Sequence, residues 1–149
     1  MIDYGSFAMN AMRMEKAFKG AGELTNEVTL PEADVMRFVD LDKDFIGKSA
    51  TLAQPARFIC AYLEIEPDGE IDGHGGEAVL LDGQLIGATA SVAYGHSIGK
   101  ILAFAYIKPE ANRAGAQVQV IIHGKPRNGM ILGDSAAYDP ESKKPRVDG

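Results

Sequence analysis

The chain has 149 residues, a hydrophobic fraction of 46% and a net charge of −6, values typical of one globular domain with a real core. The acidic balance and the lack of basic clusters exclude a nucleic-acid-binding surface. No apolar run reaches the roughly 18 residues of a membrane span, so a membrane protein is excluded too. Polar residues from Asp3 onward predict that there is no signal peptide, and the single cysteine, Cys60, excludes an intramolecular disulfide. We therefore expect a cytoplasmic protein.

The first predicted element is a helix over Ser6–Lys19. Its apolar residues recur at helical spacing and predict one buried stripe, formed by Phe7, Ala11, Met14 and Phe18. Ser6 is the expected N-cap, and Gly20 or Gly22 is expected to end the helix in a left-handed conformation. Glu15 precedes Lys19 by four residues, the favourable order for an exposed ion pair.

Arg13 lies almost opposite this stripe and is the strongest candidate for a binding residue. An arginine held on the second face of a buried helix needs an anionic or carbonyl partner. Two interpretations stay open at this point. The partner is a ligand, or it is an internal acid such as Glu15 or Glu32.

The next segment is expected to be less regular. Thr25–Pro31 is predicted to be extended because the residue before a proline avoids the helical region. Arg37–Asp40 is predicted as a short strand, and Asp44–Gln54 as a short helix that stops before Pro55.

From Arg57 onward, short apolar runs alternate with turn residues. Asp82 and Gly83 tolerate the positive φ angles of a type I′ turn and predict a β-hairpin. The expected strands are Phe58–Glu66, Ala78–Leu81, Gln84–Ile86, Ala88–Tyr94, Ile101–Lys108, Val118–His123 and Arg127–Leu132. Six or seven strands at this spacing predict a small barrel or sandwich. The predicted class is therefore α+β, and the tail Tyr138–Arg146 is expected to be a packed strap or disordered.

No catalytic or metal-binding residue emerges from the residue patterns. Asp40, Asp42 and Asp44 imitate the start of a calcium loop, but Phe45 and Thr51 occupy the positions that need glycine and glutamate. The three histidines have no metal-ligand spacing. Cys60 is expected to be an inert buried thiol. The rings of two tyrosines, Tyr94 and Tyr138, could stack on a flat ligand, although core or hairpin packing is favoured for Tyr94.

Four ordered motifs resemble a known family. They are Ala11-Met-Arg-Met-Glu-Lys16, Glu23-Leu-Thr25 with Val28-Thr-Leu-Pro-Glu-Ala33, Asp44-Phe-Ile-Gly-Lys48, and Gly95-His-Ser-Ile-Gly-Lys-Ile-Leu-Ala-Phe-Ala-Tyr-Ile107. Together they resemble the folate-dependent aminomethyltransferases, which include the glycine-cleavage T-protein and the C-terminal parts of dimethylglycine and sarcosine dehydrogenases. The first fifty residues resemble the dehydrogenase-linked branch more than the T-protein.

The resemblance implies a division into residues 1–54, the end of a folate-binding domain, and residues 55–149, a C-terminal antiparallel β-barrel. It implies that Arg13 lines a folate site, where a guanidinium can hold a carboxylate or pterin carbonyl by two hydrogen bonds. Tyr138 is the second expected cofactor-binding residue. Tetrahydrofolate is the expected cofactor of the complete protein, with FAD only if a dehydrogenase domain is fused or paired with it.

Three hypotheses about function follow. The chain is a fragment of an enzyme that moves a one-carbon unit from a glycine-derived or N-methylated amine to tetrahydrofolate. Alternatively, it is a non-catalytic β-barrel interaction or scaffold module, or a stand-alone ligand-binding protein. Because the family's catalytic carboxylate lies in an N-terminal half without a counterpart here, activity of this chain stays open. The expected partners are that half or a flavin dehydrogenase domain, folate, a small amine donor, and a second copy of the chain.

Overall fold

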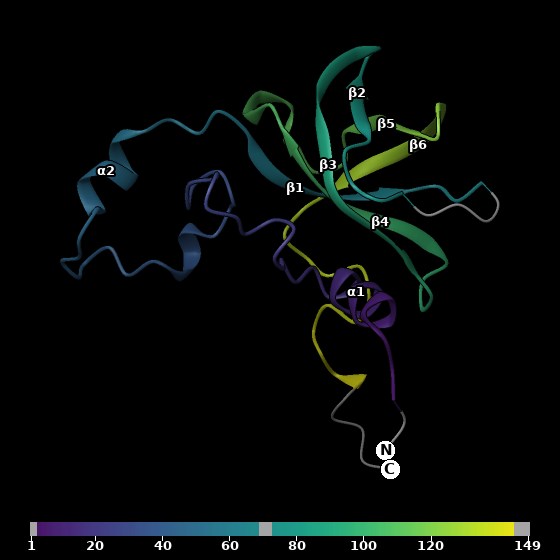
Figure 1. The fold of residues 1–149 in the computed structure, drawn as a ribbon, viewed down its shortest axis with the longest axis horizontal. Coiled ribbons are helices and arrows are strands. Elements are labelled where there is room, and N and C mark those ends of the chain that lie inside the picture. Colours follow the sequence, from purple (N-terminus) through teal and green to yellow (C-terminus); the bar gives the residue numbers. More distant parts are fainter. Residues whose placement is uncertain (1–2, 69–72, 145–149) are drawn as a thin grey trace.

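The computed structural model describes residues 3–68 and 73–144, in which a helix and a long arm precede a closed antiparallel β-barrel (Figure 1). The predicted α+β class with a β-barrel is confirmed, and the described residues contain six strands. The strands are β1 (Ile59–Ile65), β2 (Ala78–Leu81), β3 (Gln84–Gly95), β4 (Lys100–Ile107), β5 (Gln117–Ile122) and β6 (Lys125–Leu132). They follow the order β1-β4-β3-β2-β5-β6, and β6 pairs with β1 to close the barrel.

Side-chain alternation along the strands fills the barrel interior. In β5, Val118, Val120 and Ile122 are all buried, as their period of two predicts. The core continues through apolar residues of the other strands, including Leu63, Ile65, Val79, Ile101, Ala103, Ile107 and Ile131. After β4, the chain passes through a short 3₁₀ helix, η2 (Pro109–Ala111), before it enters β5.

The β2–β3 hairpin turns at the predicted residues. Asp82 and Gly83 have φ angles of 50° and 75°, which is the left-handed conformation that a type I′ turn needs. The two strands expected at Gln84–Ile86 and Ala88–Tyr94 form one continuous strand, β3. Its register against β4 shifts between Thr89 and Ser91, so a β-bulge takes up the strong curvature of a small barrel.

Helix α1 (Ser6–Glu15) is shorter than predicted, because the chain leaves the helix at Ala17 rather than at Gly20 or Gly22. Ala17 has a φ of 54°, its N–H donates to the Met14 carbonyl, and the Phe18 N–H donates to the Arg13 carbonyl. This pattern is a Schellman motif with alanine where glycine is usual. The predicted N-cap is also wrong, since Gly5 occupies that position and Ser6 is the first helical residue.

The predicted apolar stripe is buried only at its centre. Ala11 and Met14 pack against the outer face of the barrel beside Tyr62, Leu102 and Phe104. At the two ends of the stripe, Phe7 is 87% exposed and Phe18 is 65% exposed. Met9 and Met12 are exposed as well, so α1 presents apolar side chains to solvent at both ends of the buried centre.

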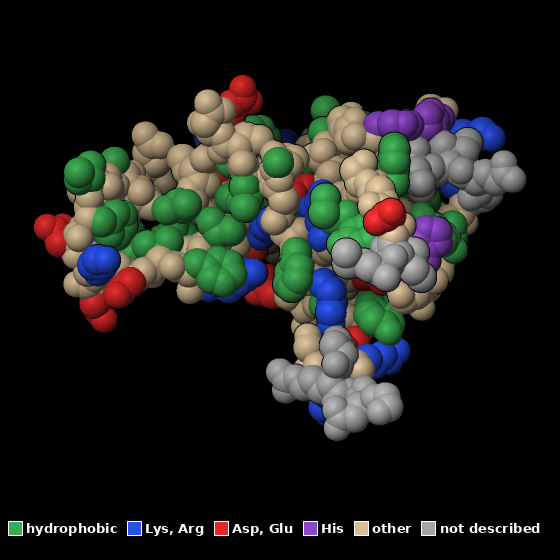
Figure 2. Space-filling model, turned by 60° about the horizontal axis from the view of Figure 1, so that its bottom comes forward, with side chains coloured by type: hydrophobic (Ala, Val, Ile, Leu, Met, Phe, Trp, Pro, Cys, Tyr) green, Lys and Arg blue, Asp and Glu red, His purple; other side chains and the backbone are tan. Residues whose placement is uncertain are grey.

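Residues 35–56, which we call the arm, contain little regular structure. Thr25–Pro31, which precedes the arm, forms turns and not the predicted extended segment. Within the arm, the predicted strand Arg37–Asp40 is wrong because Met36–Phe38 is a 3₁₀ helix, η1. The predicted helix near Asp44–Gln54 is confirmed as the shorter α2 (Lys48–Ala53). In Figure 1 the arm extends away from the barrel with α2 near its far end, and in Figure 2 hydrophobic side chains are spread along it.

An ion pair closes the base of the arm. The Arg57 Nε donates to Glu32 Oε1 at 2.7 Å, the Thr29 N–H donates to Glu32 Oε2 at 2.9 Å, and the Cys60 N–H donates to the Glu32 carbonyl at 2.8 Å. The Arg57 guanidinium first, and then the Thr29 N–H, lower the pKa of the Glu32 carboxyl from 4.5 to about 2. We call this group the Glu32–Arg57 clasp.

The clasp predicts a loss of stability in acid. Because the pKa of Glu32 is lower in the folded chain, its contribution is present above about pH 4.5 and disappears as the pH falls toward 2. Urea unfolding at several pH values in this window should show a steeper loss for the native chain than for Arg57→Met. The control is Arg37→Met, whose guanidinium lies 4.0 Å from Asp34 and is half exposed. Equal slopes for the native chain and Arg57→Met would contradict the prediction.

Inside the barrel, Arg127 is a second unusual charge. It shares the inward face of β6 with Gly129 and Ile131, and its side chain is 2% exposed. Its Nε and Nη1 atoms have no hydrogen-bond partner, and Asp68 lies 3.8 Å from Nη2 but is itself 76% exposed.

Replacing Arg127 with methionine is expected to stabilise the chain by about 1–3 kcal/mol, because buried donors without partners carry a desolvation cost. Asp68 keeps its solvation after the change, so no charge is stranded. Thermal unfolding of Arg127→Met checks this, with the exposed Arg113→Met as the matched change. A lower melting temperature for Arg127→Met alone would show that the guanidinium supports the barrel.

Candidate functional site

The contact between α1 and the barrel contains two of the four buried charged residues of the described chain, Glu15 and Glu23. Asn10, Arg13 and Glu15 project from α1, Ser91 from β3, and Ser97 from the β3–β4 turn. The Schellman turn at Ala17 brings the chain back beneath α1, so that Glu23 reaches Arg13.

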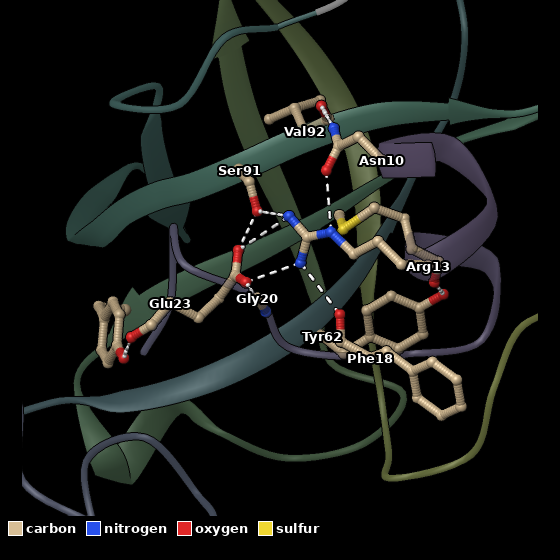
Figure 3. A network of polar contacts seen from close by, with 10 residues as sticks. Asn10, Arg13, Phe18, Gly20, Glu23, Tyr62, Ser91 and Val92 are labelled. Carbon is tan, nitrogen blue, oxygen red and sulfur yellow. Dashed lines mark hydrogen bonds and ion pairs between the residues drawn. The ribbon is translucent and has the colours of Figure 1, made fainter. Parts of the chain in front are cut away.

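Arg13 has an internal acceptor for each of its five N–H groups (Figure 3). Nη1 donates to Glu23 Oε2 at 2.6 Å and to the Phe18 carbonyl at 3.0 Å. Nη2 donates to Ser91 Oγ at 2.8 Å and to Glu23 Oε1 at 3.3 Å, and Nε donates to Asn10 Oδ1 at 2.8 Å. The guanidinium is therefore saturated by the chain itself.

Glu23 is the buried acid in this network, with a side chain that is 0% exposed. Besides Arg13, it accepts hydrogen bonds from the Gly20 N–H at 2.6 Å and from Ser91 Oγ. The Tyr106 hydroxyl donates to the Glu23 carbonyl at 2.6 Å. Glu15 and Glu32 were the acids expected as internal partners of Arg13, and this prediction is wrong because the return of the chain places Glu23 there instead.

Glu15 has a different partner from the one predicted. It is buried and accepts from the Ser97 N–H at 2.6 Å and from Ser97 Oγ at 2.8 Å. Lys19, the predicted partner, lies past the end of α1 and pairs with Asp34 at 3.0 Å. The expected i,i+4 ion pair therefore does not form, because the helix ends before Lys19.

Tyr138 lies on the C-terminal segment that packs along the end of α1. Its N–H donates to the Glu15 carbonyl at 3.0 Å, and the Lys144 ammonium lies 4.3 Å from the ring centre. Lys16 donates to the Asp139 carbonyl at 2.7 Å and holds the segment in place. The described part of the tail is thus a packed strap, and residues 145–149 lie outside the described chain. Within the described ranges, no hydrogen bond or ring contact joins Tyr138 to Arg13.

The remaining candidates have structural surroundings. Cys60 is buried, and burial raises the pKa of its thiol to about 12, as an inert thiol requires. Tyr94 packs edge-on against His96, with ring centres 5.1 Å apart. In residues 3–68 and 73–144, no group of three histidine, cysteine or acidic side chains is placed to hold a metal ion. The helices of the same residues are all too short or too polar to cross a membrane.

Three residues of the site were missed by sequence reasoning. Glu23 was noted only as part of a motif, whereas Ser91 and Asn10 carried no local signal. The Arg13–Ser91 contact joins positions 78 residues apart, and the Asn10 amide donates to the Val92 carbonyl at 3.2 Å across 82 residues. Contacts of this range depend on how the barrel packs against α1, which a local pattern does not contain.

Comparison with known proteins identifies the barrel. Residues 59–139 match the family described as the glycine cleavage T-protein C-terminal barrel domain. The chain is 38% identical over 138 residues to human mitochondrial dimethylglycine dehydrogenase and 40% identical over 131 residues to the mouse protein. These matches cover 87% and 83% of this chain but only 16% and 15% of the relatives.

More distant relatives share the same portion. A probable aminomethyltransferase of Thermococcus kodakarensis is 29% identical over 151 residues, covering 92% of this chain and 37% of the relative. The crystal structure of the glycine cleavage system aminomethyltransferase T from Bartonella henselae superposes with a TM-score of 0.72 at 20% identity, over 85% of this chain and 37% of that protein. This likeness confirms the fold. The chain belongs to the glycine cleavage T-protein C-terminal barrel family.

Proposed function

We propose that this chain is the C-terminal portion of a tetrahydrofolate-dependent aminomethyltransferase-like protein. The complete protein would transfer a one-carbon unit from a glycine-derived or N-methylated amine to tetrahydrofolate, as part of a dimethylglycine or sarcosine dehydrogenase-like enzyme. The observation that carries the proposal is the extent of the match. Identity of 38–40% covers 83–87% of the chain, so the similarity extends beyond the barrel at residues 59–139.

The exposed apolar side chains support the proposal that another domain or protein packs against this chain. All large hydrophobic side chains that are exposed in the described residues precede β1, except Leu85. We call this the N-terminal apolar surface; it comprises Tyr4, Phe7, Met9, Met12, Phe18, Leu24, Leu30, Phe38, Leu41, Ile46, Leu52 and Phe58. Apolar surface of this extent usually marks an interface. We propose that an N-terminal half, or a flavin dehydrogenase domain that would bring FAD, covers it.

Arg13 and Tyr138 remain the proposed folate contacts. Arg13 can reach a folate carboxylate only by giving up an internal acceptor, and the Phe18 carbonyl is the one at an exposed position. The half-buried Tyr138 ring lies beside Lys16 and Lys144, whose charges suit an anionic ligand. A cytoplasmic location stays a prediction that rests on the single thiol.

The proposal is tested by reconstitution. The isolated chain is expected to transfer no carbon from dimethylglycine or glycine to tetrahydrofolate. The same chain joined to the N-terminal half of a relative is expected to bind tetrahydrofolate and to carry out the transfer. Conversion by the isolated chain, or no folate binding by the joined protein despite correct folding, would refute the assignment.

A non-catalytic barrel module is the second candidate. One observation favours it. The carboxylates of Glu15, Glu23 and Glu32 all accept hydrogen bonds from groups of the chain itself. For such a module, substitutions in the N-terminal apolar surface should prevent assembly with the partner. The folate affinity of the joined protein should stay the same as long as these internal contacts are preserved.

The isolated chain is expected to self-associate through the N-terminal apolar surface. Phe7 and Met12 on α1 are 87% and 51% exposed, so Phe7→Ser with Met12→Ser should shift the light-scattering mass toward the monomer. The control is Leu85→Ser, a change of a residue on the barrel that is 60% exposed. A clean monomer at all concentrations of the native chain would contradict this expectation.

A further inference from the structure

A groove of about 640 Å³ lies on the outer face of the barrel, where β2, β3 and β4 run side by side. It includes neither Arg13 nor Glu23 and meets their network only through Tyr106, whose hydroxyl donates to the Glu23 carbonyl; it shares only Phe58 with the N-terminal apolar surface. Its main lining residues are Phe58, Ala78, Leu85, Ala88, Tyr106 and Lys108. Its volume and mostly apolar lining are those of small-molecule sites in proteins.

Small residues make the floor of the groove. Ala78 faces Ala88 across β2 and β3, and Ala88 faces Tyr106 across β3 and β4. Gly87 lies next to this row, and a Cβ atom there would be 2.0 Å from the Tyr106 carbonyl oxygen. The strands therefore run close together, and the two alanines leave a depression between larger neighbours.

The walls are apolar and partly rigid. Leu85 is 60% exposed and Phe58 is 43% exposed, so both offer apolar surface to the groove. The Tyr106 hydroxyl is fixed by its 2.6 Å hydrogen bond to the Glu23 carbonyl, which holds the ring in place. An aromatic wall that is already ordered loses little entropy when a flat ligand packs against it.

The side chain of Lys108 places a positive charge at the end of this apolar groove. The Lys108 N–H donates to the Ile86 carbonyl at 2.9 Å, and Ile59 pairs with Ile107, which brings Phe58 beside Lys108. Within the described ranges, the Lys108 ammonium has neither an ion pair nor a hydrogen bond. An unpaired ammonium next to apolar walls favours a ligand with an apolar body and one negative group.

We propose that this groove binds a flat amphipathic organic monoanion. Its ring packs between Tyr106, Phe58 and Leu85, and its carboxylate pairs with Lys108. Such a site goes beyond the proposed folate function, because none of its polar contacts uses Arg13 or Tyr138.

The probe is 2-naphthoate, titrated into the isotopically labelled chain while backbone amide shifts are recorded. Saturable shifts are expected at Gly87, Ala88 and Lys108. The uncharged 2-naphthylmethanol is expected to bind about two- to fivefold more weakly, the effect of one exposed charge contact. Lys108→Met should remove this difference, whereas Lys125→Met, a change of an exposed lysine outside the groove, should preserve it.

Ala88→Leu fills the floor and is expected to abolish binding of both probes while the chain stays folded. The proposal is overturned by any of three results. One is that no saturable shift occurs at the groove or that shifts centre on α1. Another is equal affinity for the charged and uncharged probes. The third is concentration-dependent broadening of groove amides without a probe, which would identify an interface between copies.

Discussion

Replacing Arg13 with alanine is expected to destabilise the folded chain by about 3–5 kcal/mol, because the Glu23 carboxylate stays buried without its cation. For a chain of this size each kcal/mol lowers the melting temperature by roughly 2–4 °C, so a drop of about 10 °C is expected. Thermal unfolding followed by circular dichroism measures it. The control is Arg37→Ala. The Arg37 side chain is 51% exposed, and its guanidinium makes only a long contact of 4.0 Å with Asp34.

The double variant Arg13→Ala with Glu23→Gln is expected to recover part of the loss, since a neutral amide is less costly to bury than a carboxylate. A drop no larger than that of Arg37→Ala would show that the network contributes little. If Arg13 served only a ligand, its replacement would cost little stability and would weaken folate binding by the complete protein about ten- to hundredfold. The saturated guanidinium reverses the expectation for stability, and a folate titration of the joined protein tests the affinity separately.

Gly87→Ala is expected to have an even larger effect on the barrel. The new Cβ would lie 2.0 Å from the Tyr106 carbonyl oxygen and 2.7 Å from the Ile107 Cα, both of which are backbone atoms of the paired strand β4. Backbone cannot rotate away as a side chain can, so β3 and β4 must separate. We expect a loss of more than about 4 kcal/mol, the range reserved for severe core disruption.

Gly22→Ala is the matched control for this change. Its nearest neighbour would be the Ser91 Cβ at 3.7 Å, an ordinary contact. Soluble yield, amide dispersion and melting temperature of the two variants provide the comparison. If Gly87→Ala melts within the range of Gly22→Ala, the close approach of β3 and β4 is not essential for the fold.

The barrel was predictable because its signals are local. The Asp82-Gly83 turn and the alternation in Val118–His123 each specify a strand or turn within a few residues. The end of α1 was not predictable in this way, since Ala17 adopts a conformation that glycine favours. The partners of Arg13 depend on that turn and on distant Ser91, so the sequence predicted the need for an acceptor but not which residue supplies it.

Because of the Glu32–Arg57 clasp, the fold does not depend on an unbroken chain through the arm. Both ends of residues 35–56 are held at one place, so a protease that cuts between them would break the covalent chain without separating its two parts. The N-terminal fragment would stay bound to the barrel through the contacts of Arg13 with Ser91, of Asn10 with Val92 and of Glu15 with Ser97. A chain cut in this way would therefore behave as a helical peptide bound non-covalently to a barrel, so changes in the length and sequence of the arm should leave the contact between the two parts unchanged.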